Sequence, residues 1–166
     1  MSDEPNKEAR IFSVETRFQQ MARRPGGVPR EQAIQRAQSQ IEAQKPEFAG
    51  WLDRELQDLS AAIRHLEAHS DDMPRLEDAY RKCCQLRDVG ATMGYQLISV
   101  VSSNLCEILD AIKGGAAYRK ETVDCHVDAL LLTSKPTYSQ LRPEQVPEMT
   151  AGLRRLVERA ITPDSN

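Results

Sequence analysis

The stretch 47–69, EFAGWLDRELQDLSAAIRHLEAH, decides the fold class of this chain of 166 residues. Its apolar side chains recur at steps of three and four residues, at Phe48, Trp51, Leu52, Leu56, Leu59, Ile63 and Leu66. Because an α-helix turns once in about 3.6 residues, this spacing places all of them on one side of a helix. The stretch therefore predicts an amphipathic helix that packs against a core.

The same helical spacing recurs along most of the chain, and no stretch of useful length alternates as a half-buried strand does. It predicts further helices over 13–24, 30–44, 74–90, 96–113, 121–134 and 148–161. Proline and glycine mark the expected breaks, at Pro25-Gly26-Gly27, Lys45-Pro46, 90–94 and Gly114-Gly115. We therefore expect an all-α fold.

Length and composition favour one globular domain. With 40% hydrophobic and 28% charged residues, a chain of this size can bury a full core without disulfides or metals. We predict flexible tails at 1–10 and 162–166 and a single helical domain over 11–161. Within that domain, N-terminal helices occupy 11–72, a central core 73–134, and a C-terminal helix lies in 135–161.

Charge and apolar patterning exclude several classes of protein. The net charge is −3 and the signs are interspersed, so we expect no nucleic-acid interface. The most apolar stretch, 97–101, is too short to cross a bilayer, and 1–10 lacks a signal-peptide core. Four cysteines in this context indicate free thiols in a reducing compartment. We expect a cytoplasmic protein that does not enter the membrane.

No familiar metal or catalytic pattern is present. His65 and His69 have a metal-compatible spacing, but Leu66 stands where the zinc-hydrolase pattern needs glutamate. The cysteines lack zinc spacing, and neighbours such as Cys125 and His126 point about 100° apart on a helix. We expect no metal, no cofactor and no enzymatic activity.

Most of the cysteines and one histidine are expected to belong to the packed interior. Cys83, Cys106 and Cys125 are most simply small core side chains. His126 lies inside a predicted helix, next to Val127, where ordinary packing is the expected role.

One segment does carry a functional resemblance, 84–94, CQLRDVGATMG. It resembles the signature of histidine-phosphotransfer domains, the four-helix modules of two-component phosphorelays. That signature is His-x-Leu-Lys-Gly, followed by apolar and small residues that end in glycine. Leu86 and Gly94 match it directly, Met93 takes the place of a leucine, and Arg87 stands for the lysine.

Two later segments, 104–109 (NLCEIL) and 123–130 (VDCHVDAL), and the Gly94-Tyr95 pair are similar to a divergent bacterial branch of this family. The resemblance covers about 74–134. It implies an antiparallel four-helix bundle with additional N-terminal helices, and a role in signal transduction.

Two departures from the signature bear on function. Cys84 stands where the family has its phospho-accepting histidine, and Asp88 stands where a glycine leaves room for the incoming receiver domain. A thiol near its ordinary pKa of about 8.5 is mostly protonated at neutral pH and replaces imidazole poorly. Asp88 would also repel a phosphoryl group, an effect that Arg87 partly offsets. The resemblance therefore predicts a module without phosphotransfer.

Helix geometry predicts where a partner would dock. If Leu76, Ala79, Cys83, Leu86 and Gly90 face the core, Cys84 lies about 100–120° away on a flank that also carries Asp88 and Tyr95. We expect Cys84 to be partly exposed there. The predicted partner-binding residues are Cys84, Arg87, Asp88, Ala91 and Tyr95. The expected partner is a response-regulator receiver domain or a sensor histidine kinase.

Two alternatives stay open on the sequence alone. In the first alternative, the chain is a structural or scaffolding bundle, as a monomer or a homodimer, with a groove between amphipathic helices. Or it is a thiol redox sensor that uses Cys84, which requires a thiol pKa that Arg87 favours and Asp88 opposes. The residues do not decide the signal, the cognate regulator, the oligomeric state, the role of the N-terminal helices or phosphorylation of His65, His69 or His126.

Overall fold

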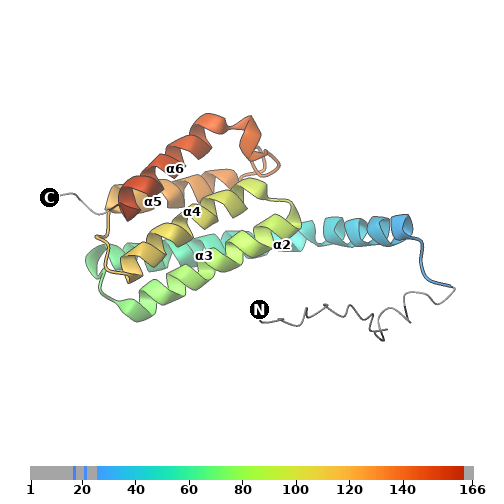
Figure 1. Ribbon diagram of the computed structural model, residues 1–166, viewed down its shortest axis with the longest axis horizontal. Helices are drawn as coiled ribbons and strands as arrows, with labels where there is room; N and C mark the ends of the chain where they lie inside the picture. Colours follow the sequence, from blue (N-terminus) through green and yellow to red (C-terminus); the bar gives the residue numbers. More distant parts are fainter. Residues whose placement is uncertain (1–16, 18–20, 22–25, 163–166) are drawn as a thin grey trace, which may run out of the picture. The chain divides into compact units, whose positions relative to one another are not determined.

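The computed structural model describes residues 17, 21 and 26–162. It contains α2 (Arg30–Ala68), α3 (Met73–Met93), α4 (Gln96–Lys113), α5 (Lys120–Thr133), a short 3₁₀ helix η1 (Pro143–Gln145) and α6 (Pro147–Ile161) (Figure 1). Because this described part holds helices and no strand, the all-α prediction is confirmed. The predicted tail 1–10 and, apart from positions 17 and 21, the predicted helix 13–24 lie outside the described residues.

Two of the predicted helices are a single helix, so the break expected at Lys45-Pro46 is wrong. The ring of proline fixes φ near about −65°, a value that a helix also uses. Pro46 therefore removes one backbone hydrogen bond and still follows the helical path of α2. An ion pair of 2.7 Å between Lys45 Nζ and Glu42 Oε1 spans the turn that precedes it.

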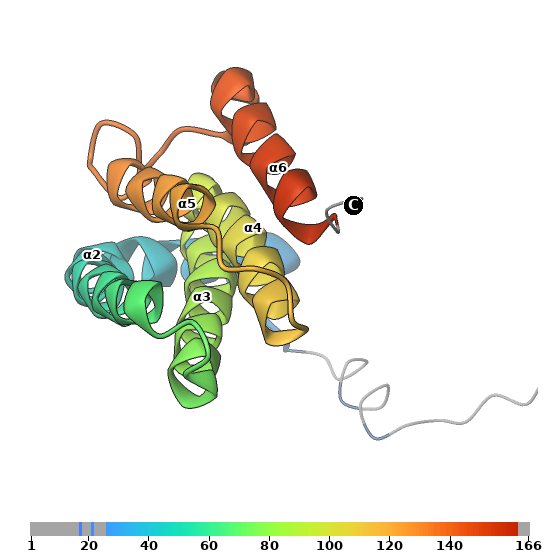
Figure 2. The same ribbon diagram turned by 90° about the vertical axis from the view of Figure 1, so that its left-hand side faces the viewer.

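The described residues divide into two units between residues 39 and 40, within α2. The buried core belongs to the second unit and is shared by five helices. The stripe predicted in 47–69 is buried at Phe48, Leu52, Leu56, Leu59, Ile63 and Leu66, and Trp51 is half-buried, which confirms this amphipathic helix. In Figure 2, α6 lies against α4 and α5. The part of α2 after residue 39 is joined to α3 by an ion pair between Glu55 and Lys82 at 3.6 Å, and to α5 by one between Glu67 and Lys120 at 2.8 Å.

Helices α3 and α4 form a tight hairpin, in which α4 runs back alongside α3 (Figure 1). The predicted weak point at 90–94 does not interrupt α3, which continues to Met93 and ends at Gly94 with φ of 84°. A positive φ of this kind favours glycine, which has no Cβ to clash. The Tyr95 N–H then donates to the Gly90 carbonyl at 2.8 Å, and the Ser99 hydroxyl donates to the Arg87 carbonyl at 2.9 Å.

Gly90 lets the two helices of this hairpin approach closely. A Cβ at that position would lie 3.2 Å from Ile98 Cγ2 and 3.4 Å from the Tyr95 carbonyl oxygen. Glycine therefore fixes the register of α4 on α3, and with it the positions of the side chains that the two helices present to one another.

Among the helices of residues 26–162, none combines the length and the hydropathy that crossing a bilayer requires.

Candidate functional site

Cys84, which the resemblance predicts to occupy the phospho-acceptor position, lies on α3 and is half-buried. The structure thus agrees with the expectation that it is partly exposed. Asp88 and Ala91 follow it at one-turn steps and are both exposed, and Arg87 is half-buried between them. Residues three and four apart lie on the same side of a helix, so these four side chains form one continuous surface of α3. We call it the Cys84 surface.

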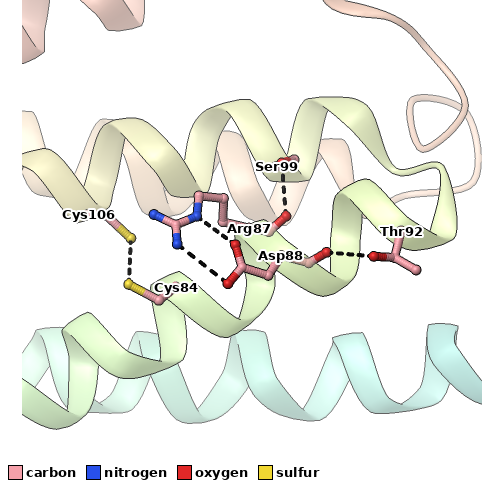
Figure 3. Close-up of polar contacts among 6 residues, drawn as sticks. All are labelled: Cys84, Arg87, Asp88, Thr92, Ser99 and Cys106. Atoms are coloured by element: carbon pink, nitrogen blue, oxygen red, sulfur yellow. Dashed lines mark hydrogen bonds and ion pairs between the residues drawn. The ribbon is translucent and has the colours of Figure 1, made fainter. Parts of the chain in front are cut away.

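A second cysteine, Cys106 on α4, contacts the predicted site. Its Sγ atom lies 3.6 Å from Cys84 Sγ, within the range of a thiol hydrogen bond (Figure 3). Cys106 is only 4% exposed, in agreement with its expected place in the core. The sequence interpretation did not pair it with Cys84. A signal was present, since the two cysteines lie at equal sequence distances from Tyr95, the residue that joins the two helices of the hairpin.

The sulfurs of this cluster have different acidities. Hydrogen bonds from the Cys83 and Cys84 thiols, helped by the charge of Arg87, lower the pKa of Cys106 to about 7 against the effect of burial. Burial and the hydrogen bond to Cys106 raise the pKa of Cys84. Cys83 is fully buried, and its hydrogen bond to Cys106 raises its pKa. The thiolate of the cluster therefore forms first at Cys106.

Arg87 and Asp88 neutralise one another on the Cys84 surface. Arg87 Nε donates to Asp88 Oδ1 at 2.8 Å, and Nη2 donates to Oδ2 at 3.4 Å (Figure 3). This pairing raises the pKa of Arg87 and lowers the pKa of Asp88. The Thr92 hydroxyl also donates to the Asp88 carbonyl at 3.0 Å. Arg87, the predicted counterpart of the signature lysine, is thus already engaged by the carboxylate of Asp88.

Tyr95 is not on this surface, and the expectation that it shares a flank with Cys84 is wrong. Its side chain is 7% exposed and packs on Phe48 of α2, with ring centroids 4.8 Å apart in an edge-to-face arrangement. The prediction continued the helical phase of α3 through position 95. The helix ends at Gly94, whose left-handed backbone redirects the next residue into the core.

Cys125 and His126 differ in burial. Cys125 is exposed, so its expected place in the core is wrong, whereas His126 is fully buried, as expected. His126 Nδ1 lies 2.7 Å from the Thr122 carbonyl oxygen. Adjacent helical residues point about 100° apart, and the buried side of α5 includes His126 and Val127 but leaves Cys125 outside it. The spacing of apolar residues in the sequence did not show that Cys125 lies outside the core.

The other two histidines lie at the end of α2. His65 Nε2 lies 3.3 Å from Asp72 Oδ2, and the His65 and His69 rings are 5.0 Å apart. Asp72 in turn accepts from the Arg75 N–H as the N-cap of α3. Among the described residues, no group of three or more histidine, cysteine or acidic side chains is placed to hold a metal ion.

Between α5 and α6 the surface forms a groove of about 510 Å³. Cys125 and Leu132 line it from α5, and Met149 and Leu156 line it from α6, with Arg155 and Arg159 also in its lining. Leu132 is 45% exposed, so the groove is an apolar surface open to solvent.

Compared with known proteins, the chain matches no protein-family model, no curated protein and no solved structure.

Proposed function

We propose that this chain is a degenerate phosphotransfer-like signalling module, which binds a response-regulator receiver domain or a sensor histidine kinase without relaying phosphate. In this proposal α3, α4 and α5 correspond to the segment that resembles histidine-phosphotransfer domains, and α2 supplies the fourth helix of an antiparallel bundle. The observation that carries it is the position of Cys84, half-exposed and followed at one-turn steps by the exposed Asp88 and Ala91.

The chemistry of this surface supports docking without phosphotransfer. The pKa of the Cys84 thiol is raised by its burial and by its contact with Cys106, so it is protonated and a weak nucleophile at neutral pH. Arg87 is held by Asp88 and is not free to stabilise a phosphoryl group. A partner that recognises helix shape can still contact α3, since the side chain of Ala91 is small and exposed.

Binding is tested with the full chain against purified receiver and kinase domains from its source organism. Ala91→Trp places bulk in the centre of the Cys84 surface, and should weaken binding at least about tenfold, or about 1.4 kcal/mol. Ala151→Trp is the matched control, because Ala151 is an exposed helical alanine on α6. Equal effects of the two variants, or no binding by any of these domains, would contradict the proposal.

Phosphotransfer is tested separately. Incubation with a phosphorylated receiver domain should leave no acid-labile label on the protein, and robust labelling at His65, His69 or His126 would contradict the proposal. The triple variant Cys84→His, Arg87→Lys, Asp88→Gly rebuilds the family signature, and we expect it to accept phosphate. Failure of a folded triple variant would argue against the alignment that places Cys84 at the acceptor position.

A thiol-based function is the second candidate, because the sulfurs of Cys84 and Cys106 lie 3.6 Å apart. A scaffolding role predicts self-association instead of receiver binding. Light scattering combined with crosslinking separates a homodimer from a monomer.

A further inference from the structure

We propose that Cys84 and Cys106 are a dithiol site that small-molecule disulfides, such as oxidised glutathione, convert reversibly to an intramolecular disulfide. The proposal concerns the sulfur chemistry of the α3–α4 hairpin and does not depend on receiver binding. It begins with geometry. The two Sγ atoms are 3.6 Å apart across the interface of two helices that a two-residue link holds together (Figure 3).

The gap between the two sulfurs is small. An S–S bond is about 2.0 Å long, so the sulfur atoms must approach by about 1.6 Å, and rotation about the two Cα–Cβ bonds can contribute to this. The register of the hairpin is fixed by Gly90, which packs on Ile98, and by the Ser99 hydrogen bond to the Arg87 carbonyl. The two thiols therefore stay opposite one another without any larger movement of the chain.

The two cysteines differ in a way that gives each a separate role. Cys84 is half-buried, so it is the more accessible cysteine of the pair. Cys106 is 4% exposed and is shielded from solvent, yet it contacts Cys84. Its sulfur is the more acidic, and Cys83 and Arg87 still favour its thiolate after Cys84 has reacted. Cys84 is thus placed to meet the oxidant, and Cys106 to resolve the product.

The reaction takes place in two exchange steps. Because the pKa of Cys84 is raised, the first step uses its minor thiolate form and is faster at alkaline pH. Cys84 loses its proton to solvent and its sulfur attacks one sulfur of oxidised glutathione, whose S–S bond breaks and releases one glutathione thiolate. The Cys106 thiolate then attacks the Cys84 sulfur of the mixed disulfide and releases the second glutathione thiolate. Both glutathiones take up a proton. Overall, two protein thiols are oxidised to one disulfide, and one glutathione disulfide is reduced to two thiols.

The remaining cysteines provide internal controls. Cys83 is fully buried, so a reagent cannot reach it directly. Cys125 is exposed on α5 and has no sulfur contact within the part of the chain that the structure describes. We therefore expect Cys125 to take up glutathione and to keep it, because no second thiol is placed to displace it.

The experiment treats the full-length protein with oxidised glutathione and follows its intact mass without reduction. We expect one stable glutathione, at Cys125, and the loss of the two thiol hydrogens of Cys84 and Cys106, both reversed by dithiothreitol. Trypsin cleaves after Lys82 and Arg87, so the disulfide should join peptide 83–87 to the peptide that holds Cys106. Fragmentation of the peptide bond between Cys83 and Cys84 then shows which of the two is bonded to Cys106 in the wild-type protein.

Variants assign the two roles. In Cys106→Ala, Cys84 should keep glutathione as a major product, whereas this species is minor in the wild type. In Cys84→Ser, Cys106 should remain a free thiol under conditions that fully modify Cys125. The Cys83→Ser variant should still form the disulfide. The proposal is overturned if wild-type Cys84 retains glutathione, if the new disulfide uses Cys83 or links two chains, or if Cys84 stays reduced while Cys125 is fully modified.

Discussion

The α3–α4 hairpin and the α5–α6 pair both carry adjacent buried and accessible side chains, but the two pairs of helices pack very differently. In the hairpin, Cys83 is sealed in the core, and the accessible Cys84 still contacts a sulfur of the facing helix. In the second pair, His126 is sealed, and the neighbouring Cys125 lines an open groove. A cysteine's chemistry therefore depends on how closely the facing helix approaches it. In the hairpin, Gly90 allows α3 and α4 to pack closely, whereas Gly152 on α6 has no neighbouring atom within 4 Å of a Cβ.

The largest expected effect compares a core leucine of the hairpin with a groove leucine. Leu105 on α4 is fully buried, and Leu105→Ala should lower the free energy of unfolding by about 2–5 kcal/mol, because it leaves a cavity. Leu156 on α6 is half-buried and lines the groove, so Leu156→Ala should cost no more than about 1 kcal/mol. Urea denaturation measures both. Equal losses would mean that the groove is packed as closely as the hairpin.

The next effect tests the glycines. Gly90→Val forces a side chain against Ile98 and should destabilise the protein by about 1–3 kcal/mol. Gly152→Ala on α6 meets no atom within 4 Å, and should stabilise the protein by about 0.5–1 kcal/mol, because alanine favours a helix interior over glycine. Thermal denaturation gives the sign of each change. A neutral Gly90→Val variant would show that the close approach of α3 and α4 is not essential.

The sequence was sufficient for the fold class because apolar periodicity is a strong signal. The stripe in 47–69 correctly predicted which side of α2 is buried. Proline was misread at Pro46, because a ring that removes one hydrogen bond is tolerated where its fixed φ fits the helix and the residues after it, from Phe48 on, pack into the core. Whether a helix can lose one backbone hydrogen bond depends on the packing of the residues beyond the proline, which the Lys45-Pro46 pattern does not contain.

The candidate site was predictable only in part. The accessibility of Cys84 followed from its helical phase, but the contact with Cys106 depends on where the hairpin turns. The same turn buries Tyr95 against Phe48, which no reasoning confined to α3 could place. Cys125 shows the converse error, since an apolar residue type next to an apolar stripe was assigned to the core and is exposed.

A pH dependence should distinguish the buried member of the α5 pair. Burial lowers the pKa of His126 in the folded protein. Below the ordinary histidine pKa of about 6.5, this side chain is therefore protonated in the unfolded chain and stays neutral in the folded protein. Stability from this group is complete above that pH and falls as the pH decreases, by at most about 1.4 kcal/mol per pH unit. Denaturant unfolding between about pH 7.5 and about pH 5.5 measures it. His126→Leu should flatten this slope, and an unchanged slope would assign it to other groups.

The smallest effect concerns the way in which α6 is held to α4. Arg154 Nη1 donates to both carboxylate oxygens of Glu107, at 2.8 and 2.7 Å, and both side chains are more than two-fifths exposed. Exposed pairs of this kind contribute about 0.2–1 kcal/mol, so Arg154→Gln should lower the free energy of unfolding within that range. Arg155→Gln is the control, because Arg155 forms no ion pair among the described residues. The difference should shrink at high salt, which screens exposed charges. If the difference between the two variants persists at high salt, the packing of the Arg154 side chain, and not its charge, holds α6 against α4.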